Sequence, residues 1–200
     1  MEPKSRRCIA LTFDDGPSPY TLQILQILKK FQIKATFFVT GESLSLHPEI
    51  LQSVVLDGHT VGNHTLNHPD ITKISQDDLH REIHSLNIAI KKIIQQDVKI
   101  FRPPYGAITK ETYRAVYEIG LFPVLWNLDT NDWDLSQTEP IEDRVMRGLK
   151  EHNIILMHDG GGPREQTVKA LPGIIKSLKQ KGYEFVTIPD YFHYVYNRRI

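Results

Sequence analysis

Two adjacent aspartates, Asp14 and Asp15, end an apolar run in the segment Thr12-Phe13-Asp14-Asp15-Gly16-Pro17. Two carboxylates this close repel each other, so the pair is favoured when a cation binds one of them and the other handles a proton. The pair therefore indicates a metal site. Aspartate followed by glycine and proline is also typical of a turn after a strand, and the two aspartates alone leave that alternative open.

Two histidines four residues apart, His64 and His68, lie in the segment Asn63-His64-Thr65-Leu66-Asn67-His68-Pro69. A single helical turn would point both imidazoles in the same direction. With one carboxylate they would form a two-histidine, one-carboxylate site that keeps open coordination positions. Zinc or another divalent first-row ion suits such a site.

The spacing of four residues is weak evidence alone, because His80 and His84 share it within a long helical pattern. We expect that second pair to be ordinary surface residues. His59 lies before its strand rather than after it, and we expect it to be packed rather than a metal ligand.

Three further segments place polar residues after predicted strands: Arg102-Pro103-Pro104-Tyr105-Gly106, Asp129-Thr130-Asn131-Asp132-Trp133 and Leu156-Met157-His158-Asp159. In the first, the prolines stiffen a backbone that could hold Arg102 beside a carboxylate and fix an N–H toward an oxyanion. Taken singly, Arg102 could be an ordinary ion pair, and Trp133 and His158 ordinary core residues. Recurrence of such segments after five strands predicts one shared site.

Short β-rich runs alternate with helical patterns, which predicts a parallel sheet with helices outside it. The predicted strands are 8–13, 35–40, 60–63, 99–102, 122–128, 153–157 and 183–188. The predicted helices are 22–31, 47–58, 75–93, 110–119, 141–149 and 167–181, with Ser75 beginning a capping box. An α/β barrel of about seven parallel strands fits better than an open sheet, because the polar segments follow the C-terminal ends of several strands.

Composition predicts one globular domain over residues 8–200 after a tail of residues 1–7. The chain has 200 residues, 40% of them hydrophobic and 24% charged, with a formal net charge of +0. A nucleic-acid or membrane surface is not indicated, and we expect a monomer. The only cysteine, Cys8, excludes an internal disulfide and is expected to be buried and inert.

The N-terminus shows no export signal or membrane span. We therefore expect either a cytoplasmic protein, or a catalytic domain excised from a longer chain that is extracellular or associated with the cell wall.

The five segments resemble, in order, the five motifs of the polysaccharide deacetylases, the carbohydrate esterase family 4 or NodB-homology enzymes. They are Thr12–Pro17, His64–Pro69, Arg102–Tyr105, Asp129–Trp133 and Leu156–Asp159, and the resemblance covers roughly residues 8–189. It implies a distorted (β/α) barrel.

The resemblance also implies roles on the base side of the site. Asp15, His64 and His68 would bind one divalent metal ion, zinc first and cobalt, nickel or manganese as alternatives. Asp14 would be the general base, and Arg102 would orient it and keep it ionised.

On the other side of the reacting carbon, the resemblance makes His158 the general acid and Asp132 the carboxylate that raises the pKa of this histidine. The backbone N–H of Tyr105 would bind the oxyanion. Trp133 and Leu156 would form the walls of an acetyl pocket.

The implied activity is metal-dependent N-deacetylation of N-acetylglucosamine residues in peptidoglycan or chitin-type glycans. An alternative is an O-acetyl esterase that acts on a xylan-type polysaccharide. A third interpretation is a glycan-binding homologue without catalysis, in which we would expect a base, acid or ligand to be missing.

Overall fold

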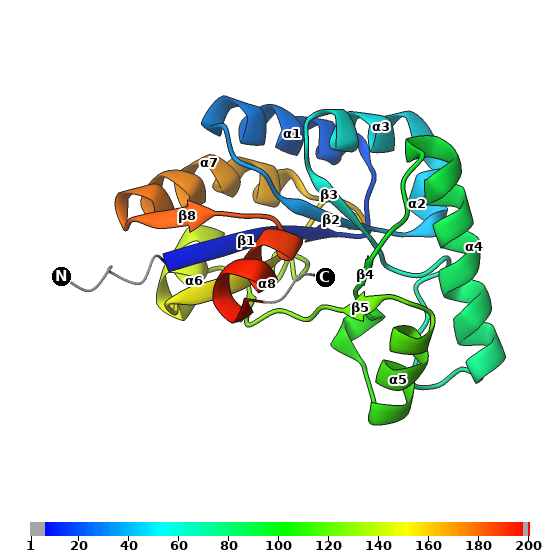
Figure 1. The fold of residues 1–200 in the computed structure, drawn as a ribbon. Coiled ribbons are helices and arrows are strands. Elements are labelled where there is room, and N and C mark those ends of the chain that lie inside the picture. Colours follow the sequence, from blue (N-terminus) through cyan, green and yellow to red (C-terminus); the bar gives the residue numbers. More distant parts are fainter. Residues whose placement is uncertain (1–6, 198–199) are drawn as a thin grey trace.

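The computed structural model describes residues 7–197 and 200, and its strands form one parallel sheet that curls into a half-barrel (Figure 1). Along the sheet the order is β5-β4-β3-β2-β1-β7-β6, and β8 pairs with the first residues of β1. The strands are β1 (Arg7–Asp14), β2 (Thr36–Val39), β3 (Thr60–Asn63), β4 (Ile100–Phe101), β5 (Phe122–Pro123), β6 (Leu128–Asp129), β7 (His152–His158) and β8 (Tyr183–Phe185). The predicted barrel-like α/β fold is confirmed.

Helices cover the outside of the curled sheet, with α1, α3 and α7 along one side and α4 beyond β4 (Figure 1). They are α1 (Pro19–Phe31), α2 (Gly41–Leu46), α3 (Pro48–Leu56), α4 (Gln76–Ile94), α5 (Lys110–Glu118), α6 (Ile141–Gly148), α7 (Glu165–Gln180) and α8 (Ile188–Tyr196), with one 3-10 turn, η1 (Pro104–Gly106). None of the helices in the described part of the chain has both the length and the apolar composition needed to cross a lipid bilayer.

The alternation of side chains along β1 divides the core into two layers. Ile9, Leu11 and Phe13 belong to the large cluster between the sheet and the outer helices. Cys8 and Ala10 face the inside of the barrel, where they share a cluster with Ile188 and Tyr191 of α8. Cys8 is buried, as predicted, and burial raises the pKa of its thiol to about 11, which disfavours the reactive thiolate.

The barrel stays open between β5 and β6, where the predicted single strand 122–128 is wrong. The backbone N–H of Val124 still bonds to Phe101 on one edge of the sheet, whereas that of Asn127 bonds to Ile154 beside the other edge. Residues 125–126 therefore cross the gap, and no ladder joins β5 to β6 among the described residues. Strand propensity identified the apolar run, but it could not show that the run leaves one edge of the sheet and joins the other.

Most predicted elements are present with ends shifted by a few residues. The hydroxyl of Ser75 caps α4 by accepting from the N–H of Asp78 at 3.1 Å, which is the first half of the predicted capping box; the reciprocal bond from the Ser75 N–H to the Asp78 side chain is absent among the described residues. Helices α2 and α8 were missed, and α8 begins at Ile188, which the sequence places in the last strand. Arg7, which the sequence assigns to the tail, is the first residue of β1, and the rest of the predicted tail, residues 1–6, lies outside the described residues.

Candidate active site

A cleft of about 490 Å³ opens at the C-terminal ends of the strands and gathers side chains from all five sequence segments. Parallel strands bring their C-terminal ends to one edge, so motifs far apart in the sequence meet there. The lining residues are Asp14, Asp15, His64, His68, Tyr105, Trp126, Asp129, Trp133, Leu156, His158, Gly161 and Arg164. The cleft therefore holds most of the predicted site residues, and two others, Arg102 and Asp132, lie directly behind it.

Asp15, His64 and His68 form one corner of this cleft, which we call the cation corner. Their ligand atoms all lie within 4.8 Å of one another. The Nε2 atoms of His64 and His68 are 3.2 Å apart, and they lie 3.5 and 3.4 Å from Oδ1 of Asp15. Two nitrogen ligands and one carboxylate oxygen thus face a common point.

The polar atoms of the cation corner fit a divalent metal ion. Oδ1 of Asp15 is buried and has no hydrogen-bond partner among the described residues. Nδ1 of His64 lies 2.7 Å from the carbonyl oxygen of Arg102, so it carries the proton and leaves the Nε2 lone pair toward the corner. Burial lowers the pKa of His64 to about 3, which keeps its imidazole neutral, as a metal ligand must be.

The two imidazoles converge through a loop after β3, as expected for a segment at a strand end, and not through a helical turn, which would also bring residues four apart together. Residues 64–70 contain no helix, and both Thr65 and His68 adopt left-handed backbone angles, with φ of 68° and 55°. The hydroxyl of Thr65 accepts from the N–H of His68 at 3.0 Å, and the side chain of Asn63 accepts from the N–H of Thr65. Side-chain bonds to the backbone set this geometry, which periodicity does not report.

Asp14 and Asp15 both face the cleft although neighbours in a strand point to opposite sides. The cause is the left-handed backbone of Asp15, with φ of 72°, where β1 has ended. Asp14 keeps the inward orientation of its strand position and is 2% exposed. Both carboxylates therefore reach the cleft because the backbone turns at Asp15.

Arg102 is fully buried behind Asp14, as the sequence predicts. Its Nη1 donates to Oδ1 of Asp14 at 2.8 Å and to the hydroxyl of Thr12 at 2.7 Å. The guanidinium lies over the ring of Phe38, 4.2 Å from the ring centroid. Burial raises the pKa of Asp14 above its usual value, and the charge and hydrogen bond of Arg102 oppose that shift.

Asp132 and His158 form a second corner, which we call the acid corner. Nδ1 of His158 lies 2.7 Å from Oδ1 of Asp132, and the backbone N–H of His158 donates to Oδ2 at 2.9 Å. The hydroxyl of Thr167 also donates to Oδ2, at 2.7 Å. Because Nδ1 is occupied, Nε2 of His158 is the ring atom left for the cleft.

The charges in the acid corner favour a protonated imidazole. Burial lowers the pKa of His158, but the hydrogen bond and charge of Asp132 outweigh burial, so the pKa lies above its usual value. Burial alone would raise the pKa of Asp132, but the hydrogen bonds from His158 and Thr167 hold it below its usual range. The pair is thus an imidazolium beside a carboxylate.

Tyr105, Trp133 and Leu156 line the cleft, as predicted, with very different exposure. Leu156 is buried, whereas Tyr105 and Trp133 are 70% and 52% exposed and form the rim. Tyr105 has φ of 59° in the turn that Pro103 and Pro104 stiffen. The cleft therefore has an apolar wall below and two aromatic rings at its entrance.

Four lining residues were not predicted to belong to the site: Trp126, Asp129, Gly161 and Arg164. Trp126 crosses the gap of the barrel, 5.4 Å from the Arg102 guanidinium, and was hidden inside a predicted strand. Nε of Arg164 donates to the carbonyl of Gly160 at 2.7 Å. The three consecutive glycines that follow Asp159 were the sequence signal that could have identified the segment containing Gly161 and Arg164.

The histidines that were expected to lie outside the site do so. His80 and His84 are exposed on α4. His59 is buried, and its Nδ1 accepts from the backbone N–H of Ala35 at 3.0 Å. Burial lowers the pKa of His59 to about 4, so this histidine is a neutral, packed residue.

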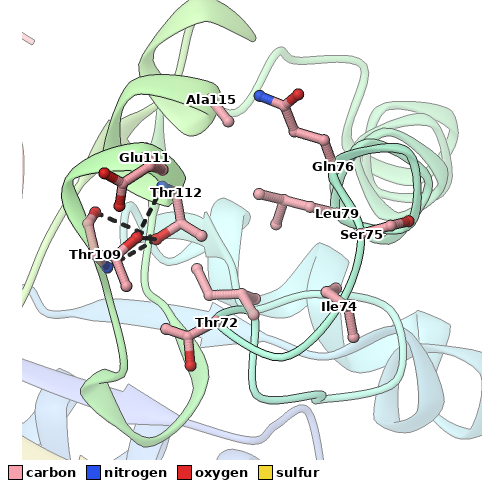
Figure 2. Close-up of a pocket in the computed structure, with 10 residues that line it drawn as sticks. Thr72, Ile74, Ser75, Gln76, Leu79, Thr109, Glu111, Thr112 and Ala115 are labelled. Atoms are coloured by element: carbon pink, nitrogen blue, oxygen red, sulfur yellow. Dashed lines mark hydrogen bonds between the residues drawn. The ribbon is translucent and has the colours of Figure 1, made fainter.

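A second cavity of about 480 Å³ lies between the first turns of α4 and α5 (Figure 2). The hydroxyls of Ser75 and Thr109 cap these helices, and Thr109 bonds with Thr112. Among the described residues that line it, Glu111 is the only carboxylate and there is no histidine. The two cavities are similar in volume, but the groups that could perform chemistry lie in the cleft at the strand ends.

Comparison with known proteins agrees with this arrangement. The family model for polysaccharide deacetylase matches residues 1–124. A peptidoglycan-N-acetylglucosamine deacetylase of Bacillus cereus is 37% identical over 195 residues, which cover 96% of this chain and 91% of the relative. A chitooligosaccharide deacetylase of Rhizobium leguminosarum bv. trifolii is 36% identical over 196 residues, which cover 92% of this chain and 91% of the relative.

The fold agrees equally well with solved structures. A peptidoglycan N-acetylglucosamine deacetylase bound to 4-naphthalen-1-yl-N-oxidanyl-benzamide superposes with a TM-score of 0.90 at 35% identity, over 96% of this chain and 90% of that chain. Sequence and fold therefore agree over nearly the whole length, and the chain belongs to the polysaccharide deacetylase family, carbohydrate esterase family 4.

Proposed function

We propose that this protein hydrolyses the acetamido group of N-acetylglucosamine residues in peptidoglycan or chitin-type glycans and releases acetate. The observation that carries the proposal is Oδ1 of Asp15, which has no hydrogen-bond partner among the described residues and faces two imidazole nitrogens, in the same cleft as a histidine, His158, whose Nδ1 contacts the carboxylate of Asp132. The names of the two relatives described above, one for peptidoglycan and one for chitooligosaccharides, support this substrate class.

Asp15, His64 and His68 hold one divalent cation in this proposal. Two imidazoles and one carboxylate favour zinc, and cobalt, nickel and manganese also accept such ligands. When bound, the cation lowers the pKa of water and polarises the acetyl oxygen. The carbonyl of Arg102 orients His64 for this task through the bond to Nδ1.

Asp14 is the general base. Its Oδ1 is held by Arg102, so Oδ2 is the atom that takes the proton from the attacking water. Oδ2 lies 3.7 Å from Nε2 of His64, beside the cation corner. The charge and hydrogen bond of the buried Arg102 guanidinium oppose the rise in pKa that burial imposes on this carboxyl, and so favour its ionised form.

His158 is the general acid, and Nε2 donates its proton to the amide nitrogen as the C–N bond breaks. An amide nitrogen is a poor leaving group unless it is protonated, so this step needs an imidazolium near neutral pH. Asp132 supplies that state by raising the pKa of His158.

The remaining predicted residues bind the substrate. The backbone N–H of Tyr105, in its rigid turn, is the donor for the oxyanion. Leu156 and Trp133 enclose the acetyl methyl group, and the exposed ring of Tyr105 stands where a sugar would enter.

Acetate release from chitopentaose, peptidoglycan and acetylxylan, measured side by side with and without added zinc, tests the proposal. We expect zinc-dependent release from at least one of the first two substrates. Release from acetylxylan alone would make the protein an O-acetyl esterase. Binding of a glycan without release of acetate would make it a non-catalytic homologue.

The exposed pair on α4 offers a matched control for the cation corner. His64→Ala should abolish zinc-dependent release and lower zinc affinity. His84→Ala, which removes an identical side chain at the same spacing from its partner, should change neither. Equal zinc affinity in both variants would contradict the proposed ligands.

A further inference from the structure

Asp159 follows His158 directly, yet the mechanism above gives it no role. Its side chain is 1% exposed. Oδ2 accepts from the hydroxyl of Thr21 at 2.5 Å, whereas Oδ1 is buried and has no hydrogen-bond partner in the described part of the chain. A buried carboxyl with one satisfied oxygen destabilises the fold, so packing alone does not explain this residue.

The contacts of Asp159 converge on the turn that carries Asp15. The backbone N–H of Asp159 donates to the carbonyl of Asp14 at 3.0 Å, and its own carbonyl accepts from the hydroxyl of Ser18. The carboxylate lies against Gly16 so closely that a Cβ at that glycine would overlap it. Asp159 therefore touches the chain directly before and directly after Asp15.

The backbone of Asp15 needs such external support. A residue with a side chain rarely adopts φ of 72°, and this angle costs conformational free energy. On the opposite side of the turn, the hydroxyl of Ser43 donates to the carbonyl of Asp15 at 2.7 Å, and the N–H of Thr40 donates to the carbonyl of Gly16 at 3.1 Å. The turn is thus held between Asp159 on one side and the start of α2 on the other.

We propose that Asp159 is a positioning residue that holds Asp15 in its left-handed conformation, so that two neighbouring carboxylates share one cleft. Without this support the turn at Asp15 relaxes toward extended backbone, which moves its carboxylate away from His64 and His68. The inference rests on the proposed function, because it assigns Asp159 to the same cation site. Residues that orient metal ligands from behind commonly change metal affinity by about 10- to 100-fold.

The test compares zinc affinity in Asp159→Ala and Asp159→Asn, measured by competition with a chromophoric chelator. Asp159→Ala removes the contacts with Thr21 and Gly16, and we expect zinc affinity to fall about 10- to 100-fold. Asp159→Asn keeps the shape and an oxygen for the Thr21 hydroxyl, and we expect affinity within about threefold of wild type, since the proposed role depends on shape.

A second pair of variants covers the case in which Asp159→Ala does not fold. Gly16→Ala pushes a methyl group into the Asp159 carboxylate and should also weaken zinc binding. Gly120→Ala is its control, because Gly120 has φ of 87° but open space around it, far along the chain from the site. Gly120→Ala should lower the melting temperature and leave zinc affinity unchanged.

Two results would overturn the inference: zinc affinity in folded Asp159→Ala equal to that of wild type, or equal losses in Asp159→Ala and Asp159→Asn. The second result would mean that charge, and not position, is what Asp159 provides. A wild-type protein that binds no divalent cation would instead overturn the proposed function, so the two failures are distinguishable.

Discussion

The acid corner and the cation corner both contribute side chains to one cleft, but they differ in how completely protein hydrogen bonds satisfy their carboxylates. In the acid corner, both oxygens of Asp132 accept hydrogen bonds, from His158 and from Thr167. In the cation corner, Oδ1 of Asp15 is buried with no partner among the described residues, although two imidazole nitrogens surround it. The carboxylate of the first corner is fully hydrogen-bonded by the protein, whereas that of the second has a buried oxygen aimed at two imidazole nitrogens.

This difference indicates what each corner does. Two imidazole Nε2 atoms 3.2 Å apart repel each other if both present lone pairs, and a second proton on His64, at Nε2, is disfavoured because the pKa of this histidine is about 3. A divalent cation removes the repulsion and satisfies Asp15 at once. The acid corner needs no such ion, because Asp132 supplies the charge that keeps His158 protonated.

A large loss of activity with zinc binding intact is expected when the acid corner is removed alone. His158→Ala should lower kcat by about 10²- to 10⁴-fold, because the leaving nitrogen loses its proton donor. Zinc affinity should stay within about twofold of wild type, since the cation corner loses no contact. Steady-state kinetics and a zinc titration check this prediction, and a large loss of zinc affinity would show that the corners are not independent.

Removal of the cation should destabilise the fold around the cation corner. A ligand present at about 100 times its dissociation constant stabilises by about 2.7 kcal/mol, which for a chain of this length is a melting shift of roughly 5 to 10 °C. We expect a chelator to lower the melting temperature of wild type by this amount. His68→Ala should melt at the same temperature with and without chelator, and a shift equal to that of wild type would place the ion elsewhere.

Neutralising the carboxylate of the acid corner should change the pH profile of activity. Asp132 raises the pKa of His158, so the acid stays protonated to higher pH in wild type. In Asp132→Asn this pKa falls, and the limb where activity is lost with rising pH should move to lower pH by about one unit or more. An unchanged limb in a profile of kcat against pH would contradict the coupling of the two residues.

The smallest effect is expected at Thr167, whose hydroxyl donates to Oδ2 of Asp132 and not to Oδ1, the oxygen that contacts the imidazole of His158. Thr167→Val removes one hydrogen bond of about 1 kcal/mol, so kcat should fall roughly tenfold or less. Thr167→Ser keeps the hydroxyl and should retain most of the activity. A larger loss in the serine variant than in the valine variant would show that the methyl group, rather than the hydroxyl, matters.

Much of the fold was predictable because strands and helices differ in hydrophobic period. The strand 122–128 was not, because an apolar run looks the same whether it keeps one neighbour or crosses from one sheet edge to the other at residues 125–126. Helix α8 was missed for a related reason: Ile188 fits a strand as well as a helix until its contact with the inside of the barrel is known.

The site was predictable in membership and less so in geometry. Residue types and their positions after strands placed Asp14, Asp15, His64 and His68 at one edge of the sheet, and the resemblance to the family selected Asp15 as the carboxylate of the cation corner. The left-handed turns at Thr65 and His68 were not predictable, because they depend on side-chain bonds to the backbone, which periodicity does not encode.

The central claim is that two neighbouring aspartates have separate tasks, and one comparison tests it most directly. Zinc titration and acetate release should be measured on Asp14→Asn and Asp15→Asn under identical conditions. We expect Asp14→Asn to bind one zinc ion per chain and to release no acetate, whereas Asp15→Asn should lose zinc binding. Loss of zinc from Asp14→Asn with retention in Asp15→Asn would contradict it and reverse the two roles.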